Sequence, residues 1–251
     1  MVFGFKMIVR KEWMDETLSL VLDGKNVKEI RSFLDEYLST QKPSGGIGPK
    51  RNRATYGMAF ALLGVWYRDA PELESMQKRL IAVARKTHRE DWMPLHWAML
   101  ASAYPFWVMV NEQAGNLFGL QDVITAGQVY ARMKDILGDT QTVARNTRFA
   151  IATMVSWGLV EKTDKIGHYR KGKTMCVGDM PTALLLESVL RATEGRRSEF
   201  NELALHRSLY CFSLASMSAT TFSIYSKPYI EMNQYGLTGE YVSMSVPTDR
   251  K

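Results

Sequence analysis

The chain has 251 residues, of which 46% are hydrophobic and 23% are charged. These fractions exclude a largely disordered chain, and the length suits one large domain or two small ones with a substantial core. The net charge of +6 is modest for this length, so its distribution along the chain is more informative than its total.

Cysteine content and hydropathy indicate the cellular environment. Cys176 and Cys211 cannot form a disulfide framework and show no CxxC spacing, which favours a reducing compartment in which both are small buried apolar side chains. The first ten residues carry charges where a signal peptide needs an apolar core. The most apolar runs, 54–67 and 97–110, are shorter than the ~20 residues that span a bilayer. We therefore expect a soluble, cytoplasmic protein that does not associate with membranes.

The first hundred residues show helical periodicity. Residues 11–41 predict two amphipathic helices separated at Gly24, because apolar residues recur at helical spacing on one face of each. Further helices are predicted at 54–67, 71–86 and 92–104. We therefore expect residues 1–104 to form an all-α bundle.

A basic, glycine-rich loop is predicted at 42–53, a segment that contains no acidic residue. It is not a Walker phosphate loop, which needs Gly-Lys-Ser/Thr, because Pro49 precedes Lys50 and Arg51 follows it. Two interpretations stay open: the loop contacts phosphates, or it lies free in solvent.

The positive charge is concentrated in residues 142–173. This segment has seven basic side chains against Glu161 and Asp164, a net +5 that is nearly the entire excess. Such a concentration is typical of a phosphate-binding surface, although a solvated charged face also has this composition.

The same region predicts three helices followed by a hairpin. The helices are expected at 106–118, 125–137 and 142–157, with Thr125 as an N-cap and Gly138 ending the second helix. A hairpin follows, with its turn around residues 164–167. This order of elements predicts a winged helix-turn-helix over residues 105–178.

The third helix has two distinct faces. The predicted inward face consists of Val143, Thr147, Ala150, Ile151, Met154 and Val155. The predicted outward face consists of Thr142, Arg145, Arg148, Phe149 and Ala152, with Gln141 and Asn146 alongside near the helix start. Arginine pairs with guanine in a bidentate manner, while Gln and Asn suit adenine, so the outward face is suited to contact base edges.

The hairpin adds Lys162, Lys165, His168, Arg170, Lys171 and Lys173. A wing with these residues would follow the phosphate backbone or the minor groove. The stretch Thr-Val-Ala-Arg-Asn-Thr-Arg…Met-Val-Ser-Trp-Gly-Leu-Val-Glu-Lys resembles the recognition helix and wing start of many winged-helix proteins. The predicted DNA-binding residues are therefore Gln141, Thr142, Arg145, Asn146, Arg148, Phe149, Lys162, Lys165, His168, Arg170, Lys171 and Lys173.

Residues 179–251 predict a second, degenerate winged-helix module. Helices are expected at 183–191, 202–214 and 218–225, followed by a hairpin of strands 229–235 and 240–245 joined by Gly-Leu-Thr-Gly. From Met180 to the C-terminus seven basic and seven acidic side chains cancel. We therefore expect this module to pack against the rest of the chain or to bind a partner, and not to bind DNA.

The layout as a whole resembles one family, the BrxA accessory proteins of BREX phage-defence systems. The likeness is carried by the step Tyr104-Pro105-Phe106, which leads into the predicted winged helix, and by residues 142–162. Elsewhere it rests on the order of helices alone. The resemblance implies a DNA-binding accessory component without catalysis of its own, and it assigns no site residue.

No enzymatic motif is apparent. The four histidines, His88, His96, His168 and His206, form no HxxxH or HExxH motif, and Pro94 interrupts the helical face between the first two. No Gly-Xaa-Ser-Xaa-Gly stretch occurs. We expect no catalytic residue, metal or cofactor, with His88 and His206 as surface or capping residues.

Two functions remain. The first is a non-catalytic DNA-binding protein, either a transcription regulator or an accessory component of phage defence, with double-stranded DNA and other proteins of such a complex as partners. The alternative is a protein-interaction scaffold that docks partner proteins on a winged-helix fold.

Overall fold

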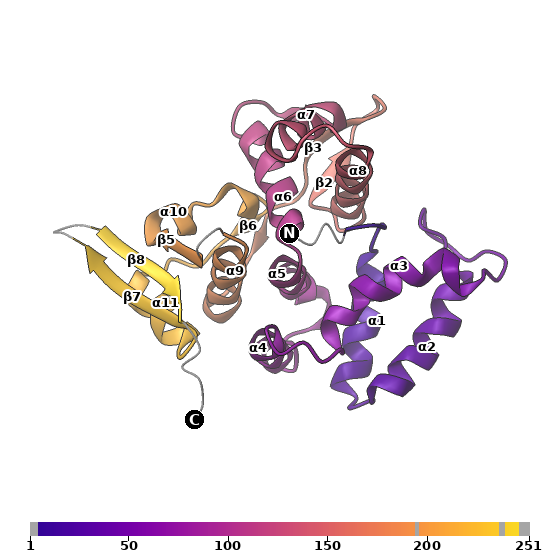
Figure 1. Ribbon diagram of the computed structural model, residues 1–251, viewed down its shortest axis with the longest axis horizontal. Helices are drawn as coiled ribbons and strands as arrows, with labels where there is room; N and C mark the ends of the chain where they lie inside the picture. Colours follow the sequence, from indigo (N-terminus) through magenta and orange to yellow (C-terminus); the bar gives the residue numbers. More distant parts are fainter. Residues whose placement is uncertain (1–4, 194–195, 236–238, 246–251) are drawn as a thin grey trace.

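A computed structural model describes residues 5–193, 196–235 and 239–245 and shows a mainly helical chain with small sheets (Figure 1). The α-helices are α1 (Lys11–Leu22), α2 (Val27–Thr40), α3 (Arg53–Leu63), α4 (Glu74–Ala84), α5 (Met93–Ala103), α6 (Pro105–Phe118), α7 (Ala126–Leu137), α8 (Gln141–Ser156), α9 (Asp179–Ala192), α10 (Phe200–Ala204) and α11 (Ala219–Ser226). Short 3₁₀ helices are η1 (Gly64–Trp66), η2 (Arg89–Trp92) and η4 (Arg207–Leu209). The strands are β1 (Val123–Thr125), β2 (Val160–Lys162), β3 (His168–Lys171), β4 (Met175–Cys176), β5 (Arg197–Glu199), β6 (Phe212–Ser213), β7 (Ile230–Tyr235) and β8 (Gly239–Met244).

Helices α1 to α3 form the bundle at the N-terminal end. Its helices begin and end where local signals place them, because Gly24 takes a positive φ of 74° in the α1–α2 turn and Asn26 with Glu29 forms a capping box at the start of α2. The predicted helices over 11–41 are confirmed. Helix α4 begins at Glu74, later than the sequence predicts, because residues 71–73 form a turn.

Helix α5 lies at the centre of the molecule, and its residues 93–101 are all buried. It packs against α4, α6 and α9. Glu187 of α9 has no exposed surface, and a buried carboxylate must be paired to be tolerated. Arg79 of α4 donates to it at 2.7 Å, which links α4 to α9, and Arg191 of α9 donates to it at 2.9 Å. The buried core is continuous from Phe5 to Val242.

Residues 105–171 place three helices against a three-stranded sheet. The order of elements is α6, β1, α7, α8, β2, β3, and the strand order is β1-β3-β2. Both pairings are antiparallel, with Ile124 opposite Tyr169 and Glu161 opposite Arg170. The predicted helices and hairpin of this segment are therefore present, and β1 is an element that the sequence did not indicate.

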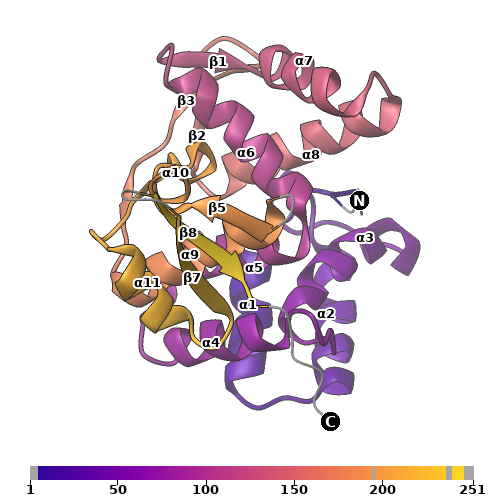
Figure 2. The same ribbon diagram turned by 60° about the vertical axis from the view of Figure 1, so that its left-hand side comes forward.

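The C-terminal segment repeats this order. Its elements run α9, β5, α10, α11, β7, β8, its strand order is β5-β8-β7, and η4 and β6 are inserted between α10 and α11. The two views in Figures 1 and 2 show this small sheet beside α9 and α11. Helix α11 and the strands of the predicted hairpin are confirmed, while its predicted connection over 236–238 falls outside the described residues. The predicted helix over 202–214 is wrong, because α10 ends at Ala204 and Phe212 is drawn into a parallel pair with β4.

The two cysteines differ in environment. Cys211 is buried, but Cys176 is exposed at the end of the short strand β4. The expectation of burial is wrong for Cys176, because alternate residues of a strand face opposite sides and Met175 takes the inner position. Among the described helices, none is both long and apolar enough to cross a bilayer.

Gly115 sits where α6 meets η4 most closely, and the structure predicts opposite effects for two helical glycines. A Cβ at position 115 would lie 1.9 Å from the main-chain oxygen of Arg207, whereas a Cβ at Gly57 of α3 would meet nothing within 4 Å. Gly115→Ala should destabilise the protein by about 1–3 kcal/mol through overpacking. Gly57→Ala should stabilise it by roughly 0.5–1 kcal/mol through helix propensity. Urea unfolding followed by circular dichroism measures both, and a stable Gly115→Ala variant would contradict the packing of α6 against η4.

Candidate nucleic-acid interface

The turn between α7 and α8 is fixed at both ends. Gly138 ends α7 with a φ of 86°, and Thr140 caps α8 by accepting from the main-chain N–H of Val143. Asp139 accepts from Lys134 and from the Tyr130 hydroxyl, each at 2.6 Å, and these hydrogen bonds lower its pKa. The carboxylate next to the start of α8 is thus compensated within the turn.

The inward face of α8 is largely the one that the sequence predicts. Val143, Thr147, Ala150, Ile151 and Met154 are buried, and Val155 is half-buried. This face packs toward α6, α7 and the hairpin. The rotational position of α8 is therefore fixed by its apolar stripe.

The outward face is exposed at its most polar positions. Gln141, Thr142, Arg145 and Arg148 are exposed. Phe149 and Ala152 are half-buried, and Phe149 packs against the core.

The sequence predicts that Asn146 contacts DNA, and the structure contradicts this. Its side chain has no exposed surface, because its position follows Val143 by three residues and directly precedes Thr147, which places it on the inward face. It cannot contact a ligand on the surface of α8.

The hairpin presents a second group of cations. Lys162, Lys165, Arg170, Lys171 and Lys173 are exposed, whereas His168 is half-buried with its Nδ1 3.1 Å from the main-chain oxygen of Ile166. Lys173 lies beyond the end of β3. Ile166 at the tip is 97% exposed, an apolar position that the sequence pattern did not single out.

These cations are mostly uncompensated. Within the part of the chain that the structure describes, Arg170 is the one member of the predicted set with an ion-pair partner, Glu161 at 2.9 Å. Cations that outnumber the acidic side chains of a surface create a field that attracts polyanions. The charge along α8 and the hairpin is therefore complementary to that of an extended anion.

A cleft of about 720 Å³ joins the two cationic elements. Arg148 of α8 and Lys162 and Tyr169 of the hairpin line it. The opposite wall consists of Ile8, Arg10, Pro43 and Ser44 from the N-terminal region. The structure thus brings Arg148 and Lys162 together and adds Arg10, which sequence reasoning missed because it lies far away in the chain.

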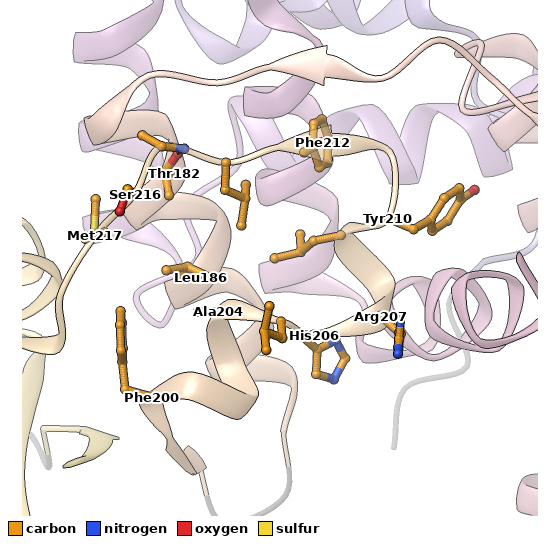
Figure 3. A pocket seen from close by; sticks show the side chains of 14 residues that line it. Thr182, Leu186, Phe200, Ala204, His206, Arg207, Tyr210, Phe212, Ser216 and Met217 are labelled. Carbon is orange, nitrogen blue, oxygen red and sulfur yellow. The ribbon is translucent and has the colours of Figure 1, made fainter. Parts of the chain in front are cut away.

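A second hollow, of about 450 Å³, lies in the C-terminal segment between α9, α10 and the chain that follows (Figure 3). Its walls are mainly apolar, with Leu186, Phe200 and Phe212 among them, and His206 and Arg207 lie toward one end. His206 Nδ1 is 2.8 Å from the hydroxyl of Ser208, and burial lowers the pKa of this histidine. The same nitrogen accepts from the main-chain N–H of Ser208, so His206 caps η4, one of the two roles, surface or capping, that the sequence predicts for it.

Comparison with models of protein families, with curated proteins and with solved structures gave no significant match.

Two substitutions in α8 test the assignment of its faces. Met154→Asp should unfold the protein, because a buried carboxylate without a partner costs several kcal/mol. Arg148→Ala should leave the melting temperature nearly unchanged, since exposed substitutions typically stay within about 0.5 kcal/mol. Differential scanning calorimetry of the two variants makes the comparison. A folded Met154→Asp variant beside a destabilised Arg148→Ala variant would mean that the two faces are reversed.

Proposed function

We propose that residues 105–178 form a winged helix-turn-helix and that the chain is a non-catalytic protein that binds duplex DNA. The order of elements supports this fold, because helix, strand, two helices and a hairpin, with β3 central in the sheet, is the arrangement expected of a winged helix. In this proposal α8 is the recognition helix and the β2–β3 hairpin is the wing.

The observation that carries the proposal is the exposed and mostly uncompensated cationic surface on these two elements. Arg145 and Arg148 project from the solvent side of a helix whose opposite side is buried. An α-helix fits the major groove of B-DNA, and guanidinium groups pair with guanine edges there. Lys162, Lys165 and Lys171 on the hairpin would contact phosphates, which position the protein without specifying a sequence.

The role of the protein follows from its sequence resemblance. The likeness to BrxA implies an accessory component of phage defence, and a transcription regulator is the other role consistent with DNA binding without catalysis. In either role the chain would act together with other proteins.

A second candidate function, protein docking, is favoured by the C-terminal segment. We propose that this segment is a degenerate winged-helix module whose recognition-helix equivalent is α11. Its surface differs from that of α8, since Ile224 of α11 is 62% exposed and Met232 of β7 is 37% exposed. Exposed apolar side chains on a segment without net charge suit a protein partner. This alternative predicts a partner whose binding is unaffected by changes in α8.

The first test is retardation of duplex DNA in a gel at two salt concentrations. The protein should bind, and its affinity should fall steeply with salt, because each phosphate contact releases counterions. Arg145→Ala together with Arg148→Ala should weaken binding by about 1–3 kcal/mol for each guanidinium that reaches a base edge. Failure of the wild-type protein to retard DNA at low ionic strength would overturn the proposal.

The wing is tested by Lys165→Ala together with Lys171→Ala. Both side chains are exposed, so the fold should persist while affinity falls by a similar factor on every DNA sequence. Fluorescence anisotropy with several unrelated duplexes measures this. A matched control is Lys25→Ala with Lys28→Ala, which removes two exposed lysines where the chain enters α2, at the end of this helix away from the loop over 42–53. A change of preferred sequence at constant affinity would show that the hairpin is not a phosphate-binding wing.

A further inference from the structure

The basic loop over residues 42–53 lies beside the outward face of α8. Pro43 and Ser44 of this loop line the same cleft as Arg148 and Lys162. In both views of the molecule the strands of the hairpin lie on one side of α8, and α3, which follows the loop, lies on the other (Figures 1 and 2). Three segments that are distant in sequence therefore meet at one surface.

A chain of hydrogen bonds fixes the loop relative to α8. Val9 donates its N–H to the hydroxyl of Thr153 at 3.0 Å, and its carbonyl accepts from the indole of Trp157 at 2.9 Å. The neighbouring Arg10 donates to the main-chain oxygen of Pro43 at 3.2 Å. The path from α8 through the N-terminal segment to the loop is thus continuous.

The loop is also held at its own base. Gly48 donates to the carbonyl of Thr40 at 2.8 Å, Arg51 donates to Ser39 at 2.7 Å, and Lys42 donates to Gly46 at 3.1 Å. A loop with these main-chain bonds has a defined shape before any ligand arrives. Its main chain therefore places the Cα atoms of Lys50 and Arg51 at defined positions.

The charge of the loop is strongly positive. Residues 42–53 include Lys42, Lys50, Arg51 and Arg53 and no acidic residue. Arg53 is near Asp35 at 3.7 Å, and Arg10 is near Glu12 at 3.4 Å. In the described part of the chain Lys42, Lys50 and Arg51 have no ion-pair partner; Lys50 is exposed, and Lys42 and Arg51 are half-buried.

We propose that this loop is the second phosphate-binding wall of the DNA site, opposite the hairpin. The inference rests on the proposed function of α8. An α-helix of about 10–12 Å diameter fills the major groove, which leaves a phosphate backbone on each side of it. The hairpin contacts one backbone, and Lys50 and Arg51 contact the other. The N-terminal bundle thus takes part in binding DNA and does not serve only as support.

The decisive variant is Lys50→Ala together with Arg51→Ala, compared with the Lys25→Ala, Lys28→Ala control on the same α2–α3 region. The loop variant should bind duplex DNA more weakly, and the slope of log K against log salt should fall by about 2, roughly one for each phosphate that the variant no longer touches. The control should match the wild type. Unchanged melting temperatures exclude unfolding as the cause.

Directed cleavage gives an independent readout of position. An iron chelate that generates hydroxyl radicals would be attached at Ser44→Cys in a Cys176→Ser background, since Ser44 and Cys176 are exposed and Cys211 is buried. A second chelate at Thr142→Cys, at the start of α8, serves as the reference. Cleavage from position 44 should occur at a discrete site on the DNA backbone next to the site that is cut from position 142.

The outcomes separate the two proposals. If Arg145→Ala with Arg148→Ala weakens binding while the loop variant binds as the wild type does, or more tightly, the second wall is wrong and the DNA-binding function of α8 stands. Absence of cleavage from position 44 also overturns it. If the wild-type protein binds no duplex, both proposals fall together.

Discussion

Two hydrogen bonds of the Val9 main chain determine how the N-terminal segment packs against α8. The N–H and carbonyl of Val9 are both bonded to α8, through Thr153 and Trp157. Thr153 is fully buried, and a buried hydroxyl without a partner would cost free energy, so this contact is strongly favoured. Phe5 stacks on Trp107 at 5.3 Å and extends the contact to α6. These contacts hold the segment that precedes α1 against α8 and α6.

Two segments with the same order of elements carry different surfaces. At α8 the exposed positions include Arg145 and Arg148, whereas at α11 they include Thr220 and Ile224. In both helices the buried face must be mostly apolar to pack on the core, whereas the exposed face is not constrained in this way. The exposed residues can therefore differ while the fold stays the same. A fold of this kind does not determine a ligand, and function must be argued from the exposed side chains.

Local sequence patterns predicted the helices and hairpins well, because periodicity and caps act over a few residues. These patterns failed where the structure depends on the exact position of one residue in a helix or on a contact between residues far apart in the chain. Asn146 is polar yet faces inward, since helical phase overrides its chemistry. The shortening of the helix after Phe200 depends on the pairing of β6 with β4, and the place of the basic loop depends on Val9, 144 positions from Thr153. No pattern within a short window contains that information.

In the proposed complex with DNA, the hydrogen bonds around Val9 have a consequence for recognition. Phosphate contacts carry no sequence information, but they determine how close the recognition helix comes to the bases. If the hairpin and the loop are both fixed relative to α8 before binding, association costs little conformational entropy, and more of the interaction energy appears as affinity. The spacing between the hairpin and the loop would also be fixed. On a duplex whose groove width does not match that spacing, Arg145 and Arg148 would not reach the base edges. Sensitivity to DNA shape would then come from the bonds of Val9, which lie within the protein and touch no DNA.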